Sequence, residues 1–171
     1  MTTDQLTIRS ATLDDLPSLT EIHNYYVTNT HITFDTRPFR VEERISWFHE
    51  HCDGKRYRLL IAEQSGLGIV GYATTGRFRA KAAYDTTVEI SVACDPKATG
   101  RGIGTGLYQA LFRSLAQEDI NRVLAGIAQP NLASQALHEK FGFSSIGTFT
   151  AVGRKFGKYW DVVWMERPLT L

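Results

Sequence analysis

The chain has 171 residues, of which 43% are apolar and 22% charged, proportions typical of a globular protein. That length can bury a sizeable core, so we expect a single domain over residues 1–171. The net charge of +1 gives no field that would attract nucleic acid or an anionic membrane, and we expect neither as a partner. No apolar run approaches the ~20 residues of a membrane span, and the first residues lack the features of a signal peptide. These features predict a cytoplasmic protein.

The first half of the chain predicts a strand, two helices and a strand pair. In order, we expect a strand over 6–9, a helix opened by Asp14 and Asp15, a helix over 41–51, and strands 58–63 and 69–75 joined by a turn at 65–68. The apolar face of the first helix falls at helical spacing, through Leu16, Leu19, Ile22 and Tyr26. In the second helix, we expect Ile45 and Phe48 to face the core.

The second half alternates strands and helices. In order, we expect a central strand over 86–94, a helix over 104–117, a strand over 123–128, a helix from Asn131 to near Lys140, and closing strands 145–153 and 161–166. Leu107, Leu111 and Leu115 share one face of the first of these helices, and Asn131 is a suitable N-cap for the second. The order predicts a mixed α/β fold with a mostly antiparallel central sheet and helices on both faces.

A glycine-rich loop after the central strand predicts an anion site. Pro96 ends the strand, and Gly100, Gly102 and Gly104 allow backbone N–H groups to turn toward an anion. The following helix adds its positive N-terminal end, and Arg101 adds a cation. The loop lacks the third glycine of a dinucleotide-binding fingerprint and the lysine of a P-loop. It therefore predicts a pyrophosphate cradle of another kind, with an unliganded glycine-rich turn as the alternative.

The loop, residues 99–104, resembles motif A of the GCN5-related N-acetyltransferases, Q/R-x-x-G-x-G/A. The resemblance covers nearly the whole chain and is strongest to the phosphinothricin and methionine sulfoximine acetyltransferase group. It is carried by residues 33–34, 83–84, 87–92, 99–104, 129–131, 134, 137–143 and 153–162. It implies the fold of that family, acetyl-CoA as donor, and often a homodimer. The chain departs from the pattern at Thr99, where the family has Gln or Arg, and at Ala93-Cys94, where close relatives have Tyr-Val.

Glu89 is the leading candidate for the general base. An amine attacks a thioester only in its neutral form, so a base must take its proton, directly or through a water. In an alternating strand, Glu89 shares a face with Thr87, Ser91 and Ala93, opposite the face of the valines and isoleucine. The resemblance gives the same residue as the base. The alternative is an exposed or ion-paired glutamate.

The helix after Asn131 carries a second constellation. Asn131, Ser134 and His138 lie on one stripe, which we expect to face the cofactor. The neighbouring apolar stripe, expected to pack on the sheet, comprises Ala133, Ala136, Leu137 and Phe141. The resemblance implies that Asn131 contacts the pantetheine arm or its carbonyl. Many relatives have a Tyr near the position of His138 that protonates the leaving thiolate, whereas His138 occupies the position typical of the phosphinothricin group. His138 could be acid, base or structural.

The remaining site predictions follow from the resemblance. The residues expected to bind acetyl-CoA are Val92, Ala93, Cys94, Thr99, Gly100, Arg101, Gly102, Ile103, Gly104, Asn131 and Ser134. A small amino-acid-like acceptor carries an anionic group, which basic side chains recognise. The candidates for that contact are Arg77, Arg79, Lys81 and Lys155, with Phe34 and Tyr84 as apolar walls. Trp160 and Trp164 are expected in the core or a dimer interface, and no metal is expected.

The predicted reaction is direct transfer of an acetyl group to the α-amino group of such an acceptor. Backbone N–H groups near Val92 and Cys94 would polarise the thioester carbonyl. An acyl-cysteine route through Cys94 lacks a paired base, and Cys52 and Cys94 are both expected to be reduced. Two other functions stay open at this point: a protein N-terminal or lysine acetyltransferase, and a non-catalytic CoA-binding sensor.

Overall fold

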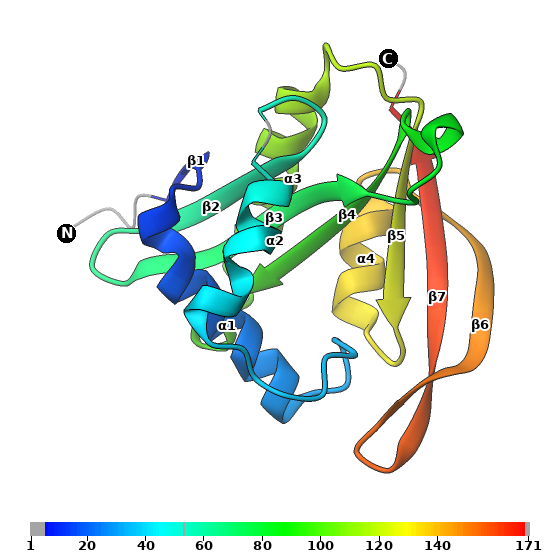
Figure 1. The fold of residues 1–171 in the computed structure, drawn as a ribbon, viewed down its shortest axis with the longest axis horizontal. Coiled ribbons are helices and arrows are strands. Elements are labelled where there is room, and N and C mark those ends of the chain that lie inside the picture. Colours follow the sequence, from blue (N-terminus) through cyan, green and yellow to red (C-terminus); the bar gives the residue numbers. More distant parts are fainter. Residues whose placement is uncertain (1–5, 53, 170–171) are drawn as a thin grey trace.

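The computed structural model describes residues 6–52 and 54–169. It contains a seven-stranded sheet with helices on both faces (Figure 1). The elements are β1 (Leu6–Ser10), α1 (Leu16–Asn29), α2 (Ile45–Glu50), β2 (Arg58–Gln64), β3 (Gly68–Arg77), β4 (Thr87–Cys94), α3 (Ile103–Leu115), β5 (Arg122–Ala128), α4 (Leu132–Lys140), β6 (Ser144–Lys155) and β7 (Lys158–Pro168). Four 3-10 turns lie at Leu13–Asp15, Val41–Arg44, Ala82–Tyr84 and Pro96–Ala98. The strand order is β1-β2-β3-β4-β5-β7-β6, with β4–β5 as the parallel pair and the other neighbours antiparallel. The predicted fold class and the central place of β4 are confirmed.

Two hydrophobic clusters cover opposite faces of the sheet. β2 contributes to both, because Leu60 points into one cluster and Leu59 and Ile61 into the other. The predicted leucine row of α3 is fully buried on the first face, and Leu16 and Leu19 of α1 are buried on the second. Each such side chain contributes about 1.5–3 kcal/mol by leaving water. The two faces explain why the sequence of β2 is a continuous apolar run.

One core prediction is wrong. Ile45 is 39% exposed, whereas Phe48 is buried as expected. The cause lies in the backbone ahead of α2, where residues 41–44 form a 3-10 turn instead of the start of one long helix. A 3-10 turn has three residues per turn, so it changes the phase of the side chains that follow.

The start of α1 is fixed by a buried carboxylate. Asp15 accepts two hydrogen bonds from the Arg9 guanidinium, at 2.7 and 2.8 Å, and one from the Thr12 backbone N–H at 2.7 Å. The Arg9 hydrogen bond lowers the pKa of Asp15 to about 2. This contact ties β1 to α1 and sets the position from which α1 crosses the sheet.

β4 and β5 separate part-way along their length. Among the described residues, their pairing covers Thr87–Glu89 against residues 122–124, while the other edge of β4 stays paired with β3 as far as Cys94. Beyond Glu89 the two strands diverge, and α4 lies beside the opening (Figure 1). The backbone of residues 90–94 on that side is therefore available to a ligand. No helix in the described part of the chain is both long and apolar enough to span a bilayer.

Candidate active site

A cavity of about 440 Å³ lies where β4 and β5 separate, and we call it the loop cavity. It is bordered by the end of β4, the glycine-rich loop and the first turns of α3 and α4. Ten residues predicted to bind the cofactor line it: Val92, Ala93, Cys94, Thr99, Gly100, Gly102, Ile103, Gly104, Asn131 and Ser134. The eleventh, Arg101, is exposed and lies outside this lining.

The glycine-rich loop holds itself in shape by its own polar groups. Asp95 accepts a hydrogen bond from the Lys97 backbone N–H at 2.9 Å, and the Thr99 hydroxyl donates to the Pro96 carbonyl at 3.3 Å. Gly100 and Gly102 have φ angles of +79° and +75°, which side chains disfavour. Because Thr99 turns back into the loop, any anion held here meets chiefly backbone N–H groups and the start of α3.

Asn131 is the N-cap of α4, as predicted, and its side-chain oxygen accepts the Ser134 N–H at 3.1 Å. Both residues also border the loop cavity. The start of α4 therefore presents capped backbone and small polar groups to this cavity, which suits an elongated, partly polar ligand.

A second cavity, of about 730 Å³, contains Glu89, and we call it the Glu89 cavity. Its walls come from α1, α2, β3 and β4, and Arg77 is the one predicted acceptor-binding residue in its lining. The two cavities share His23, Tyr72 and Ser91. A group bound in one cavity can therefore meet a group bound in the other at these three side chains.

Glu89 has the properties of a proton acceptor. It is half-buried, on the same face of β4 as Ser91, and burial raises the pKa of its carboxyl above the ordinary value, opposed by the charge of Arg79. A raised pKa makes the carboxylate a stronger base near neutral pH. Glu89 lines the Glu89 cavity, two residues along the strand from Ser91, which borders both cavities.

His138 lies elsewhere than predicted. It is 3% exposed and outside both cavity linings, with its Nδ1 2.7 Å from the Ser134 carbonyl and its Nε2 2.9 Å from the Tyr108 hydroxyl. Burial lowers the pKa of His138, opposed by the Ser134 carbonyl. The expectation that His138 faces the cofactor side by side with Asn131 is therefore wrong. Of the apolar stripe expected to pack on the sheet, Leu137 and Phe141 do pack against the core, whereas Ala133 and Ala136 are not buried.

His138 is buried because it packs against aromatic rings that come from outside α4, so the sequence of α4 alone does not predict its burial. The imidazole packs edge-on against the rings of Tyr108 and Phe143, at 5.3 and 5.0 Å between centroids. Hydrogen bonds to both ring nitrogens offset the cost of burying them. A direct role of His138 in proton transfer stays a prediction.

The other residues predicted to bind the acceptor do not line the Glu89 cavity. Lys155 is buried and its Nζ donates to the Thr33 carbonyl at 2.8 Å, while the Phe34 ring fills the space beside Gly153. Lys81 and Tyr84 are exposed around the 3-10 turn before β4. Arg79 borders a small third cavity, together with Trp164. Contact of these residues with an acceptor stays a prediction.

Sequence reasoning missed the residues that join or wall the two cavities. Arg44 is 4% exposed, donates to the Leu19 carbonyl at 3.1 Å, and lies 3.9 Å over the Trp47 ring at the Glu89 cavity. His23 was recognisable in principle, because it lies four residues after Leu19 on the inward face of α1. Tyr72 gave no local signal, since it reads as one more apolar residue of β3.

The fold agrees with what comparison with known proteins shows. Residues 8–164 match the family model described as "Acetyltransferase (GNAT) domain". The chain belongs to this family of GNAT acetyltransferases.

Individual relatives narrow the class further. The chain is 52% identical to the phosphinothricin N-acetyltransferase of Streptomyces coelicolor, over 98% of each chain. It is 33% identical to the L-methionine sulfoximine/L-methionine sulfone acetyltransferase of Pseudomonas paraeruginosa, over 95% of this chain and 94% of that one. The structure matches that of a GNAT superfamily phosphinothricin acetyltransferase from Sinorhizobium meliloti in complex with AcCoA, with a TM-score of 0.91 and 32% identity over 96% and 89% of the two chains.

Proposed function

We propose that the protein transfers the acetyl group of acetyl-CoA to the α-amino group of a small amino acid of the phosphinothricin or methionine sulfoximine type. The observation that carries this proposal is the meeting of the loop cavity and the Glu89 cavity at His23, Tyr72 and Ser91. The donor would occupy the first cavity and the acceptor the second. The names of the relatives support both the donor and the class of acceptor.

The loop cavity suits each part of the donor. Backbone N–H groups around Gly100–Gly104 and the start of α3 would hold the pyrophosphate. The unpaired edge of β4, residues 90–94, would receive the pantetheine arm as a further strand receives its neighbour. Backbone N–H groups near Val92 and Cys94 would polarise the thioester carbonyl as negative charge develops on its oxygen.

The Glu89 cavity suits an anionic amino acid. Arg77 and the buried Arg44 place two guanidinium groups in its walls, and these favour a carboxylate or phosphinate. Trp47 and Tyr57 add aromatic surface for the side chain. Trp47, His49 and Glu50 of α2 form one wall of this cavity, which favours a small acceptor over a folded protein.

In the proposed reaction, Glu89 removes one proton from the acceptor ammonium through a water. The neutral amine attacks the thioester carbon, the new C–N bond forms, and the C–S bond breaks to release CoA. Burial raises the pKa of the Cys94 thiol to about 11, so this thiol is protonated at neutral pH. A protonated thiol is a poor nucleophile, which favours direct attack over an acyl-cysteine intermediate.

The main test is a screen for free-thiol release. Purified protein and acetyl-CoA are mixed with phosphinothricin, methionine sulfoximine, other amino acids, and peptides with free N-termini or lysines. We expect release with the small amino acids. Release with peptides alone would support a protein acetyltransferase, and binding of acetyl-CoA with no turnover on any amine would support a CoA sensor.

Glu89→Gln tests the base. We expect kcat to fall by about 10²-fold or more with acetyl-CoA affinity unchanged, because general base catalysis contributes about 10²–10⁴-fold. Glu63→Gln is the matched control, since Glu63 lies on β2 and pairs with Arg9 at 3.4 Å, outside both cavity linings. Turnover of Glu89→Gln equal to that of the control would remove Glu89 as the base.

We also propose a single-domain, cytoplasmic protein that works as a homodimer. Ile146, Phe149 and Val152 of β6 are each more than half exposed. Two of them border the small third cavity with Trp164. Exposed apolar side chains grouped on one strand are typical of a contact surface between proteins. Light scattering after size-exclusion chromatography should give twice the chain mass, and Phe149→Glu should give the monomer.

A further inference from the structure

We infer that His23, held by Asp35 and linked to Tyr72, carries a proton from the acceptor amine to the departing CoA thiolate. This inference rests on the proposed function. His23 lies on α1 and is among the three residues common to both cavities. A group that moves a proton from the attacking nitrogen to the leaving sulfur must be accessible from both sides.

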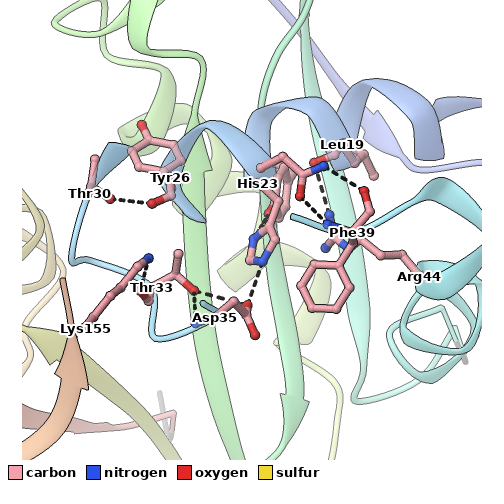
Figure 2. Close-up of polar contacts among 11 residues, drawn as sticks. Leu19, His23, Tyr26, Thr30, Thr33, Asp35, Phe39, Arg44 and Lys155 are labelled. Atoms are coloured by element: carbon pink, nitrogen blue, oxygen red, sulfur yellow. Dashed lines mark hydrogen bonds and ion pairs between the residues drawn. The ribbon is translucent and has the colours of Figure 1, made fainter. Parts of the chain in front are cut away.

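Asp35 fixes the tautomer of His23. A hydrogen bond of 2.8 Å joins His23 Nε2 to Asp35 Oδ2. The same carboxylate oxygen accepts a hydrogen bond from the Thr33 hydroxyl at 3.2 Å (Figure 2). The His23 hydrogen bond lowers the pKa of Asp35, so this carboxylate is ionised and can only accept. The imidazole therefore keeps its proton on Nε2, which leaves the lone pair of Nδ1 free to accept another.

Tyr72 connects Nδ1 to the place where the cavities meet. Its hydroxyl lies 3.4 Å from Nδ1, and the residue is 4% exposed on β3 while bordering both cavities. Burial raises the pKa of Tyr72, so the phenol stays neutral, donates to Nδ1 and keeps an oxygen lone pair for the amine. Such bonds are often long in an empty site and shorten when the reactants bind.

The segment that carries Asp35 is clamped onto α1. Asn24 donates to the Phe39 carbonyl and accepts the Phe39 N–H, both at 2.8 Å, and the Phe39 ring packs 5.8 Å from the imidazole. From β6, Lys155 donates to the Thr33 carbonyl at 2.8 Å (Figure 2). These contacts hold Asp35 against His23 and so preorganise the pair.

Charged and titratable groups approach the pair from each neighbouring element. Tyr72 comes from β3, Arg44 from the 3-10 turn before α2, Lys155 from β6 and Tyr26 from the next turn of α1. Arg44 adds to the lowering of the pKa of Asp35. Both cations favour the ionised carboxylate, and that carboxylate stabilises a positive charge on His23 once the proton arrives.

The proton balance of the reaction assigns the step. An acceptor ammonium loses two protons in forming an amide, of which Glu89 takes the first before attack. After the C–N bond forms, the second passes to the Tyr72 oxygen while the Tyr72 proton moves to His23 Nδ1. The C–S bond breaks, and the same route in reverse delivers the proton to the thiolate, which leaves as free CoA thiol. His23 returns to its neutral tautomer, and no other reactant is needed.

His23→Ala is the central test, because alanine suits a helix and leaves a space near Tyr72. We expect kcat to fall by about 10²-fold, acetyl-CoA affinity to stay within twofold, and added imidazole to restore about tenfold of the loss. Asp35→Asn should give a smaller fall, because it weakens the support of the charged ring. His31→Ala is the matched control: His31 stacks on Trp160 outside both linings, and imidazole should not raise its activity.

Three results separate this inference from the proposed function. Wild-type turnover with any amine tests the function alone. If wild type turns over, His23→Ala within twofold of it overturns the inference, and so does a loss that imidazole cannot reverse. If wild type is inactive on every amine, the ¹⁵N shifts of the imidazole still decide: we expect the Nε2–H tautomer in wild type and its loss in Asp35→Asn, and an Nδ1–H tautomer in wild type would overturn the inference.

Discussion

Gly102→Val separates a structural effect of the glycine-rich loop from a binding effect. Gly102 has a φ of +75°, and a Cβ added there would meet no atom within 4 Å, so the protein itself has room for it. The cost to folding is the left-handed backbone, about 2 kcal/mol for a residue other than glycine. For a chain of this length that corresponds to a fall in Tm of about 4–8 °C.

The binding effect is larger, because Gly102 lines the loop cavity, where the pyrophosphate is expected. Acetyl-CoA at 100 times its Kd should stabilise wild type by about 2.7 kcal/mol. In Gly102→Val this ligand-induced rise in Tm should disappear, since the side chain blocks the approach of the phosphates to the backbone. Differential scanning fluorimetry with and without acetyl-CoA measures both quantities.

Gly66→Val is the matched control. Gly66 has a φ of +81° and equally open space, but it lies in the turn between β2 and β3, outside both cavity linings. The Tm of Gly66→Val should fall by the same roughly 4–8 °C, and acetyl-CoA should raise that Tm as much as it raises the Tm of wild type. A Gly102→Val protein that responds to acetyl-CoA as strongly as Gly66→Val would refute the placement of the pyrophosphate.

Three further predictions concern charge and reactivity. The pKa of Asp15 is about 2 in the folded protein and near 3.9 when unfolded, so its contribution of about 2 kcal/mol to the free energy of unfolding is complete above pH 5 and is lost as the pH falls toward 2. The difference in Tm between wild type and Asp15→Asn should therefore shrink as the pH falls from about 5 to about 2. A difference in Tm that stays constant would argue against the Arg9 contact as its cause. Arg79 opposes the rise of the Glu89 pKa, so Arg79→Gln should move the acid limb of the kcat/KM profile to higher pH, and a shift to lower pH would contradict this assignment. The Cys94 thiol, with a pKa of about 11, should stay unmodified when the protein is incubated with acetyl-CoA, and intact mass spectrometry would reveal an acetyl adduct if it formed.

Periodicity and loop chemistry predicted most of the fold because each element carries its own signal. The leucine row of α3 and the alternation around Glu89 depend on residues close in sequence, and the structure shows both. The prediction that Ile45 faces the core failed because residues 41–44 form a 3-10 turn. The free energies of a 3-10 turn and an α-helical turn differ little, so tertiary packing decides between them.

The site was less predictable, because its centre is assembled from distant parts of the chain. His23 and Tyr72 are 49 residues apart, and Asp35 reaches His23 from a segment without regular structure. His138 shows the converse limit. A helical wheel groups it with Asn131, but the rings of Tyr108 and Phe143 draw it into the core, and neither belongs to α4.

The partial separation of β4 from β5 has a consequence for the lifetime of the protein. The sheet has two parts, one of strands β1–β4 and one of strands β5, β7 and β6, and three residue pairs between β4 and β5 join them. Local opening costs the least free energy where few hydrogen bonds join neighbouring strands, so fluctuations should concentrate between β4 and β5. A donor bound in the loop cavity, as proposed, would bridge the two parts of the sheet, and its binding energy would add to their stability by mass action. The resistance of the chain to proteases should then rise with the concentration of acetyl-CoA.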